Sequence, residues 1–180
     1  MTPLERSFLQ SLLTNLPYTT AFTLPTAASY DRIQDGIWAC GTYACWGKDN
    51  REASVRLTGP PGAHHFEVRT IDGTANPYLA FAAILGVGLI GIRNGLELDM
   101  EESDEPAVNL SAEERQKRGI VGRFQRTLNA AREVARNNRI IDEVLGKEFV
   151  QTYLRVNEVC KLRRDDPRTR LTIDRLWRNL

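Results

Sequence analysis

The sequence predicts an α+β fold in which a few antiparallel strands are followed by a mostly helical region. Residues 41–70 contain short stretches of strand-like residues, whereas from Thr127 onward apolar residues recur at helical spacing. With 180 residues, of which 42% are hydrophobic and 26% charged, the chain has the size and composition of one globular domain. No internal repeat interrupts this pattern.

A helix is expected at the N-terminus. Thr2 and Glu5 have the spacing of a capping box, and Pro3 suits the first helical position. An apolar stripe at helical spacing follows, formed by Leu4, Phe8, Leu9, Leu12 and Leu13. A stretch rich in Thr, Ala and Pro then runs to Ser29.

Three strands are expected in the next part of the chain, at Tyr43–Trp46, Ala53–Leu57 and His65–Thr70. The linker Thr58–Gly62 contains glycines and prolines that do not continue a central strand. The last two strands are therefore expected to form an antiparallel hairpin.

The remaining chain is expected to be helical. Asn76 and Pro77 precede an apolar run, Tyr78–Ile92, which is shorter than the roughly 20 residues of a membrane helix and indicates a buried core helix. An acidic segment from Glu97 to Glu105 predicts a loop or hairpin tip. Further helices are expected after the Ser111 capping box and from Thr127, ending in an amphipathic segment, Leu171–Leu180.

The overall charge excludes a global attraction to polyanions. Because 24 basic residues balance 23 acidic ones, nothing points to nucleic acid or an anionic membrane as a partner, and any anion site must be local. The three cysteines, Cys40, Cys45 and Cys160, do not have the spacing of a disulfide framework or a zinc site. Since the start also lacks a signal-peptide pattern, a cytoplasmic location is expected.

One face of the expected hairpin carries charged side chains. Because side chains alternate along a strand, His65, Glu67 and Arg69 share a face, and Arg56 joins them from the preceding strand. This pattern is compatible with a plain solvated sheet face. It is equally compatible with a cleft in which Glu67 binds a divalent cation and the arginines hold phosphate or carboxylate oxygens.

The segment Gly86–Gly91 matches the glycine spacing of dinucleotide-binding loops. Such a loop needs a substantial helix after its third glycine, whereas here Gly95 and the acidic segment follow almost at once. These glycines therefore favour close packing between helices.

Several motifs together closely resemble the C-terminal part of the glutamine synthetase catalytic domain, and most of all the fungal FluG-type proteins. They occur in the family's order: Ser29-Tyr30-Asp31-Arg32, Asn50-Arg51-Glu52-Ala53-Ser54-Val55-Arg56, Phe66-Glu67-Val68-Arg69, Ala75-Asn76-Pro77-Tyr78 and Leu145-Gly146-Lys147-Glu148-Phe149. The resemblance implies that residues 1–180 are part of this catalytic domain. Its strand-rich site region would span about residues 30–72 and its helical region about 76–180, with the N-terminal β-grasp domain absent.

The resemblance also implies an activity, that of an ATP-dependent ligase. Such enzymes phosphorylate glutamate and let an amine displace the phosphate, using ATP with Mg²⁺ or Mn²⁺. In this sequence Glu67 matches a metal ligand, Arg51 and Arg69 match arginines around the transferred phosphoryl group and the substrate, and Arg32 matches the arginine for the glutamate carboxylate. Arg56 and His65 match positions that contact the nucleotide.

Two departures from the family pattern stand out. His65 takes the place of an arginine, and so keeps a polar contact without a permanent charge. In the segment after Arg32, the family's Gly-Tyr-Glu-Ala-Pro is here Gly36-Ile37-Trp38-Ala39-Cys40, so that Trp38 replaces the ammonium-binding glutamate. Because an indole cannot take up a proton but can cover a larger amine, an amine other than ammonia is expected as the nitrogen donor.

A third departure is that Glu67 has no partner carboxylates in comparable motifs. Since Mg²⁺ needs nearly octahedral coordination, the isolated chain is expected to lack ligase activity. Two hypotheses follow: part of a glutamine-synthetase-like ligase, which the family pattern implies would form homo-oligomers at full length, or a catalytically inactive module of FluG type with a structural or developmental signalling role.

Overall fold

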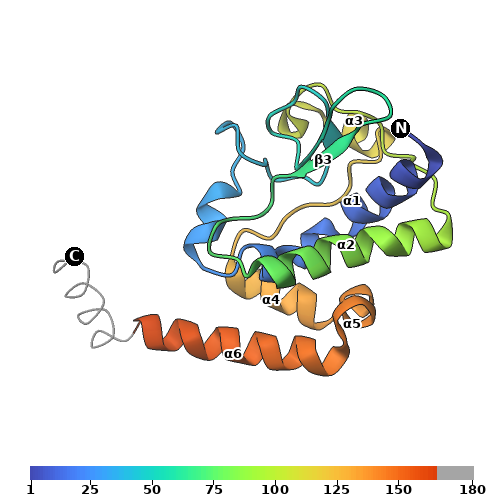
Figure 1. The fold of residues 1–180 in the computed structure, drawn as a ribbon. Helices are drawn as coiled ribbons and strands as arrows, with labels where there is room; N and C mark the ends of the chain where they lie inside the picture. Colours follow the sequence, from blue (N-terminus) through green and yellow to red (C-terminus); the bar gives the residue numbers. More distant parts are fainter. Residues whose placement is uncertain (166–180) are drawn as a thin grey trace.

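A computed structural model describes residues 1–165, arranged in three layers (Figure 1). A small sheet lies on one side of two long helices, α1 and α2, and the later helices α4, α5 and α6 lie on the other side. The elements are α1 (Pro3–Thr23), the 3₁₀ turn Ala28–Arg32, β1 (Trp46–Gly47), β2 (Val55–Thr58), β3 (His65–Val68), α2 (Pro77–Asn94), the 3₁₀ turn Ala107–Asn109, α3 (Ala112–Lys117), α4 (Leu128–Arg136), α5 (Arg139–Leu145) and α6 (Lys147–Asp165). This combination of helices with a small sheet confirms the α+β class. The expected helix at Leu171–Leu180 lies outside the described residues.

Helix α1 forms the centre of the core and is longer than the sequence indicates. Its capping box is present, with the Thr2 side chain accepting from the Glu5 backbone. The helix then passes through Pro17 into the Thr-, Ala- and Pro-rich stretch, where the buried hydroxyls of Thr19 and Thr20 donate to backbone carbonyls one turn back. Burial of this segment outweighs its poor helix propensity. Four leucines of α1 are completely buried: Leu9, Leu12, Leu13 and Leu16.

The glycines of α2 allow the close helix packing that the sequence favours. A Cβ at Gly88 would overlap the Phe8 ring, and one at Gly91 would overlap the Ser7 carbonyl oxygen of α1. Across the same contact the Ser11 hydroxyl donates to the Val87 carbonyl at 2.6 Å. The dinucleotide-loop pattern is therefore the interface between two helices, and α2 ends, as expected, at Gly95 with φ +60°.

The opposite face of α2 corrects the expectation of a buried core helix. Four large apolar residues on this face are about half exposed or more: Tyr78 (85%), Phe81 (60%), Leu85 (48%) and Leu89 (57%). By length and composition alone, α2 is long and apolar enough to cross a membrane. Core helices of soluble proteins meet the same criterion. The sides of α2 that face α1 and α5 belong to the core.

The sheet has the order β1-β2-β3. Strands β2 and β3 are antiparallel, as predicted, with Arg56 opposite Glu67 and Leu57 opposite Phe66. Strand β1, however, pairs with β2 in parallel, so the prediction of antiparallel strands is wrong for this edge. Of the predicted strand Tyr43–Trp46, Trp46 begins β1, and Tyr43 forms an isolated bridge with Arg123.

The parallel pairing arises from the loop that joins β1 to β2. The Asn50 amide in this loop donates to the carbonyls of Ser103 and Glu105, so the acidic segment holds the loop in place. The Ser103 backbone N–H in turn donates to the Trp46 carbonyl. The acidic segment is the predicted loop, but it is packed against the edge of the sheet.

Candidate active site

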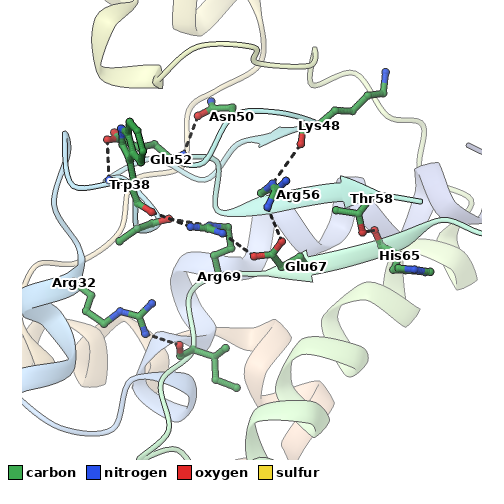
Figure 2. A network of polar contacts seen from close by, with 12 residues as sticks. Arg32, Trp38, Lys48, Asn50, Glu52, Arg56, Thr58, His65, Glu67 and Arg69 are labelled. Atoms are coloured by element: carbon green, nitrogen blue, oxygen red, sulfur yellow. Dashed lines mark hydrogen bonds and ion pairs between the residues drawn. The ribbon is translucent and has the colours of Figure 1, made fainter. Parts of the chain in front are cut away.

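The charged face of the hairpin is built around Glu67. One carboxylate oxygen lies 3.0 Å from a terminal nitrogen of Arg56, directly opposite on β2, and the other lies 2.6 Å from a terminal nitrogen of Arg69 (Figure 2). Both guanidinium groups are mostly buried, whereas the carboxylate side chain is 44% exposed. The alternation predicted from sequence therefore places the three charges on one face.

Arg69 also joins the hairpin to the flap, the segment formed by residues 36–40. Its Nε donates to the Ala39 carbonyl and a terminal nitrogen donates to the Trp38 carbonyl, both at 2.9 Å. Each of its three nitrogens thus donates to the flap or to Glu67 (Figure 2). A planar guanidinium with fixed donor directions is suited to such a bridge.

Trp38 has an unusual backbone conformation. Its φ of +55° lies in the left-handed region, which costs a residue with a side chain about 1–3 kcal/mol unless its surroundings enforce it. Three contacts do so: its N–H donates to Glu52 Oε1 at 3.3 Å, its carbonyl accepts from Arg69, and the Arg51 guanidinium lies 5.8 Å from the ring centroid. These contacts tie the flap to the hairpin and the β1–β2 loop, and Trp38 itself is 69% exposed.

Glu52 is the functional candidate that sequence reasoning missed. Its side chain is buried, with only 5% of the residue exposed, and no described residue donates a hydrogen bond to Oε2. In the sequence, the one indication of a role for Glu52 was its position between the Asn50-Arg51 motif and β2. A sequence does not, however, distinguish a buried carboxylate from an exposed one in a loop. An enclosed carboxylate oxygen without a partner is costly and points to a role beyond packing.

Two predicted site residues lie apart from this network. Arg32 donates to the Ile71 carbonyl at 3.0 Å, and Figure 2 shows it separated from Glu67. His65 is exposed at the opposite end of β3, and only its backbone carbonyl takes part in a described contact, accepting from Thr58 at 3.4 Å. Their predicted roles in binding glutamate and nucleotide remain predictions.

The cysteines near the flap are unpaired and inert, as the sequence indicates. Cys40 and Cys45 are both buried as free thiols. Burial raises the pKa of each thiol to about 11, so that neither is a thiolate near neutral pH. They act as small apolar core residues.

The described residues do not form a complete metal centre. The structure describes the side chains of residues 1–159. Among these, no group of three or more His, Cys, Asp or Glu side chains is placed to hold a metal ion. Both oxygens of Glu67 are engaged by arginines. One such carboxylate does not supply the six oxygen ligands that Mg²⁺ prefers.

Comparison with known proteins assigns this arrangement to a family. Residues 1–165 match the glutamine synthetase catalytic domain, which is more than nine-tenths of the chain. The chain belongs to the glutamine synthetase catalytic-domain family. The resemblance carried by the arginine motifs is thereby confirmed, and the network around Glu67 lies in a segment of a glutamine synthetase catalytic domain.

Relatives of this glutamine synthetase segment include proteins with different names. Protein fluG of Emericella nidulans is 37% identical over 83% of this chain, Type-1 glutamine synthetase 2 of Dictyostelium discoideum is 35% identical over 86%, and a gamma-glutamylpolyamine synthetase of Streptomyces coelicolor is 35% identical over 87%. The chain spans only 17%, 28% and 34% of their respective lengths.

Proposed function

We propose that this chain is part of an ATP-dependent carboxylate–amine ligase that forms γ-glutamyl phosphate from glutamate and couples it to an amine. The observation that carries the proposal is the network of Arg56, Glu67 and Arg69 on one sheet face, joined to the flap through Arg69. Fixed guanidinium groups stabilise the charge that develops on a transferring phosphoryl group. The family membership supports ligase chemistry.

In this proposal the residues have distinct roles. Arg51 and Arg69 bind the phosphoryl group and the substrate carboxylate, Arg32 binds the backbone carboxylate of glutamate, and Arg56 and His65 face the nucleotide. Glu67 contributes one ligand to the Mg²⁺ or Mn²⁺ that accompanies ATP, and the other ligands come from outside the described residues. Arg56 and Arg69 hold the Glu67 carboxylate in a fixed orientation until that ion binds.

The proposed amine is one larger than ammonia. Trp38 stands where the family's pattern has a glutamate, and its exposed ring offers a surface for carbon and for cationic nitrogen, but no proton acceptor. The printed name of the Streptomyces coelicolor relative, a gamma-glutamylpolyamine synthetase, agrees with a larger amine.

The second candidate is a catalytically inactive module. Two observations favour it: the similarity to Protein fluG, and the pairing of both Glu67 oxygens with arginines, which compete with a metal ion for the carboxylate. In such a module the same contacts would fix the flap against the sheet without turnover.

Phosphate release distinguishes the two candidates. We expect the 180-residue chain to release no phosphate from ATP with Mg²⁺, glutamate and a panel of amines, because its described part lacks a complete metal centre. Glu67-dependent turnover by the isolated chain would contradict this. The polypeptide of native length, isolated from its source and sized by mass spectrometry, should release phosphate in a glutamate-dependent manner that Glu67→Ala abolishes; failure with every amine would establish the inactive module.

A further inference from the structure

A pocket of about 450 Å³ opens beside the flap, next to the Glu67 network but outside it. It is lined by Trp38, Asp49, Asn50, Arg51, Glu52, Asp104 and Pro106. The pocket exists because Asn50 ties the β1–β2 loop to the acidic segment through the Ser103 and Glu105 carbonyls. Three segments far apart in the sequence thus meet around one space.

The charge of this pocket favours a cation. Its walls carry three carboxylates, from Asp49, Glu52 and Asp104, against the single guanidinium of Arg51. Asp104 is 86% exposed at its side chain and has a distant partner, Arg118, at 3.6 Å. A partly enclosed space lined by an excess of negative charge concentrates positively charged ligands.

A buried group supplies the independent indication of a ligand. Glu52 is 95% enclosed and lines the pocket, one of its oxygens accepts from the Trp38 N–H, and the other has no donor among the described residues. A cationic donor that enters beside the indole would satisfy this oxygen. The ring itself already has a cation near its face, since Arg51 lies 5.8 Å from its centroid.

We infer that this pocket binds an aliphatic amine with more than one positive charge, as the substrate of the ligase reaction. Its ammonium groups pair with Glu52, Asp49 and Asp104, and its carbon chain lies against the Trp38 ring. The assignment as substrate rests on the proposed function, whereas the binding does not. The Glu52 carboxylate reaches the space beside Trp38 from the β1–β2 loop.

Binding is measured on the 180-residue chain without ATP or glutamate. The probe is 1,4-diaminobutane at constant ionic strength, followed through the indole N–H signals in ¹H–¹⁵N NMR spectra. The chain has three tryptophans, and the Trp38 signal is the one that Trp38→Phe removes. We expect this signal to shift saturably with the diamine and not with ammonium chloride or with 1,4-butanediol, the uncharged analogue.

Charge-removing variants test which groups bind. Glu52→Gln should raise the Kd about tenfold, because it removes a charge-assisted hydrogen bond from an enclosed position. Asp99→Asn, in the same acidic segment but outside the pocket lining, should leave the Kd unchanged. If Glu52→Gln does not fold, the double variant Asp49→Asn/Asp104→Asn on exposed residues takes its place and should weaken binding by a similar factor.

The inference is overturned if butanediol or ammonium shifts the Trp38 signal as the diamine does, or if the folded charge-removing variants bind the diamine as tightly as the parent. A ligase of native length that uses only ammonia, combined with diamine binding here, would instead contradict the proposed amine while the binding site stands. No shift with the diamine would remove the site and leave the ligase proposal to its own test.

Discussion

At the scale of single residues, Arg69 carries the most connections in the candidate site. Its guanidinium is only 18% exposed and bonds to Glu67 and to two flap carbonyls, those of Trp38 and Ala39. These contacts stabilise the left-handed backbone conformation of Trp38, which is unfavourable without them. Loss of this one side chain should therefore release the flap without disturbing the core.

Arg69→Ala is expected to lower the free energy of unfolding by about 1–3 kcal/mol, because it leaves two flap carbonyls without their donors. Urea denaturation measures this loss, and hydrogen exchange should become faster at residues 38–40. Arg56→Ala is the control, since Arg56 shares the Glu67 carboxylate but is not bonded to the flap. Equal exchange rates in both variants would argue against Arg69 as the flap anchor.

At the scale of elements, α2 depends on glycine where it meets α1. The nearest neighbour of Gly91 is backbone, the Ser7 carbonyl, whereas Gly86 faces the side chain of Val144 on α5. A backbone atom cannot move aside as a side chain can. The two glycines therefore differ in how well they tolerate an added Cβ, although both lie inside the same helix.

Gly91→Ala is expected to destabilise the protein by about 2 kcal/mol, since the overlap outweighs the roughly 1 kcal/mol that alanine adds in a helix interior. Gly86→Ala has the same gain in propensity and should cost clearly less, because Val144 can change rotamer. Equilibrium unfolding in urea compares the two. A Gly91→Ala variant as stable as the parent would mean that α1 and α2 do not pack this closely.

The N-terminus of α1 should respond to acid. The backbone N–H of Thr2 donates to the Glu5 carboxylate and, despite an opposing effect of burial, holds the pKa of Glu5 below its ordinary value of 4.5, with His64 at 3.3 Å adding to the effect. Because the pKa is lowered in the folded state, this contribution is complete above pH 4.5 and is lost as the pH falls through the folded pKa.

The difference in unfolding free energy between the parent and Glu5→Gln should therefore be present near neutral pH and shrink below pH 4.5. Urea titrations across this range measure it. His64→Gln separates the contribution of the histidine contact from that of the cap, because it leaves the Thr2 bond intact. A difference that grows on acidification would contradict the assignment.

At the scale of the whole molecule, the exposed face of α2 is the largest departure from an ordinary globular surface. Leu85 and Leu89 lie about half exposed in line with Tyr78 and Phe81, whereas exposed apolar residues elsewhere, such as Val121, lie outside this stripe. Contiguous apolar patches of this kind are uncommon on monomeric proteins.

A dye that fluoresces on apolar surfaces, such as anilinonaphthalene sulfonate, should bind this face. Leu85→Lys/Leu89→Lys should reduce its fluorescence markedly while changing the free energy of unfolding by less than about 1 kcal/mol, because both side chains already contact water. Val121→Lys, which removes one exposed apolar residue outside α2, serves as the control and should have little effect. Unchanged dye fluorescence in the double variant would show that the face is covered.

Features decided by neighbours in the chain could be predicted. The capping boxes at Thr2 and Ser111, the stop at Gly95 and the common face of Arg56 and Glu67 depend on local hydrogen bonds and on the two-residue period of a strand. Those arginine and glutamate motifs, read in order, also identified the family. Because such features depend on local geometry, they can be predicted from a single sequence.

Features decided by distant contacts could not be predicted. The continuation of α1 beyond Pro17 follows from the burial of that segment. The parallel pairing of β1 follows from the hydrogen bond that Asn50 donates to the acidic segment. The enclosure of Glu52 and the exposed face of α2 depend on which surfaces meet in three dimensions. The sequence thus determined the elements, the charged face and the family, while only the tertiary structure decided the flap, the pocket and the bare helix face, because these arise where segments far apart in the chain come together.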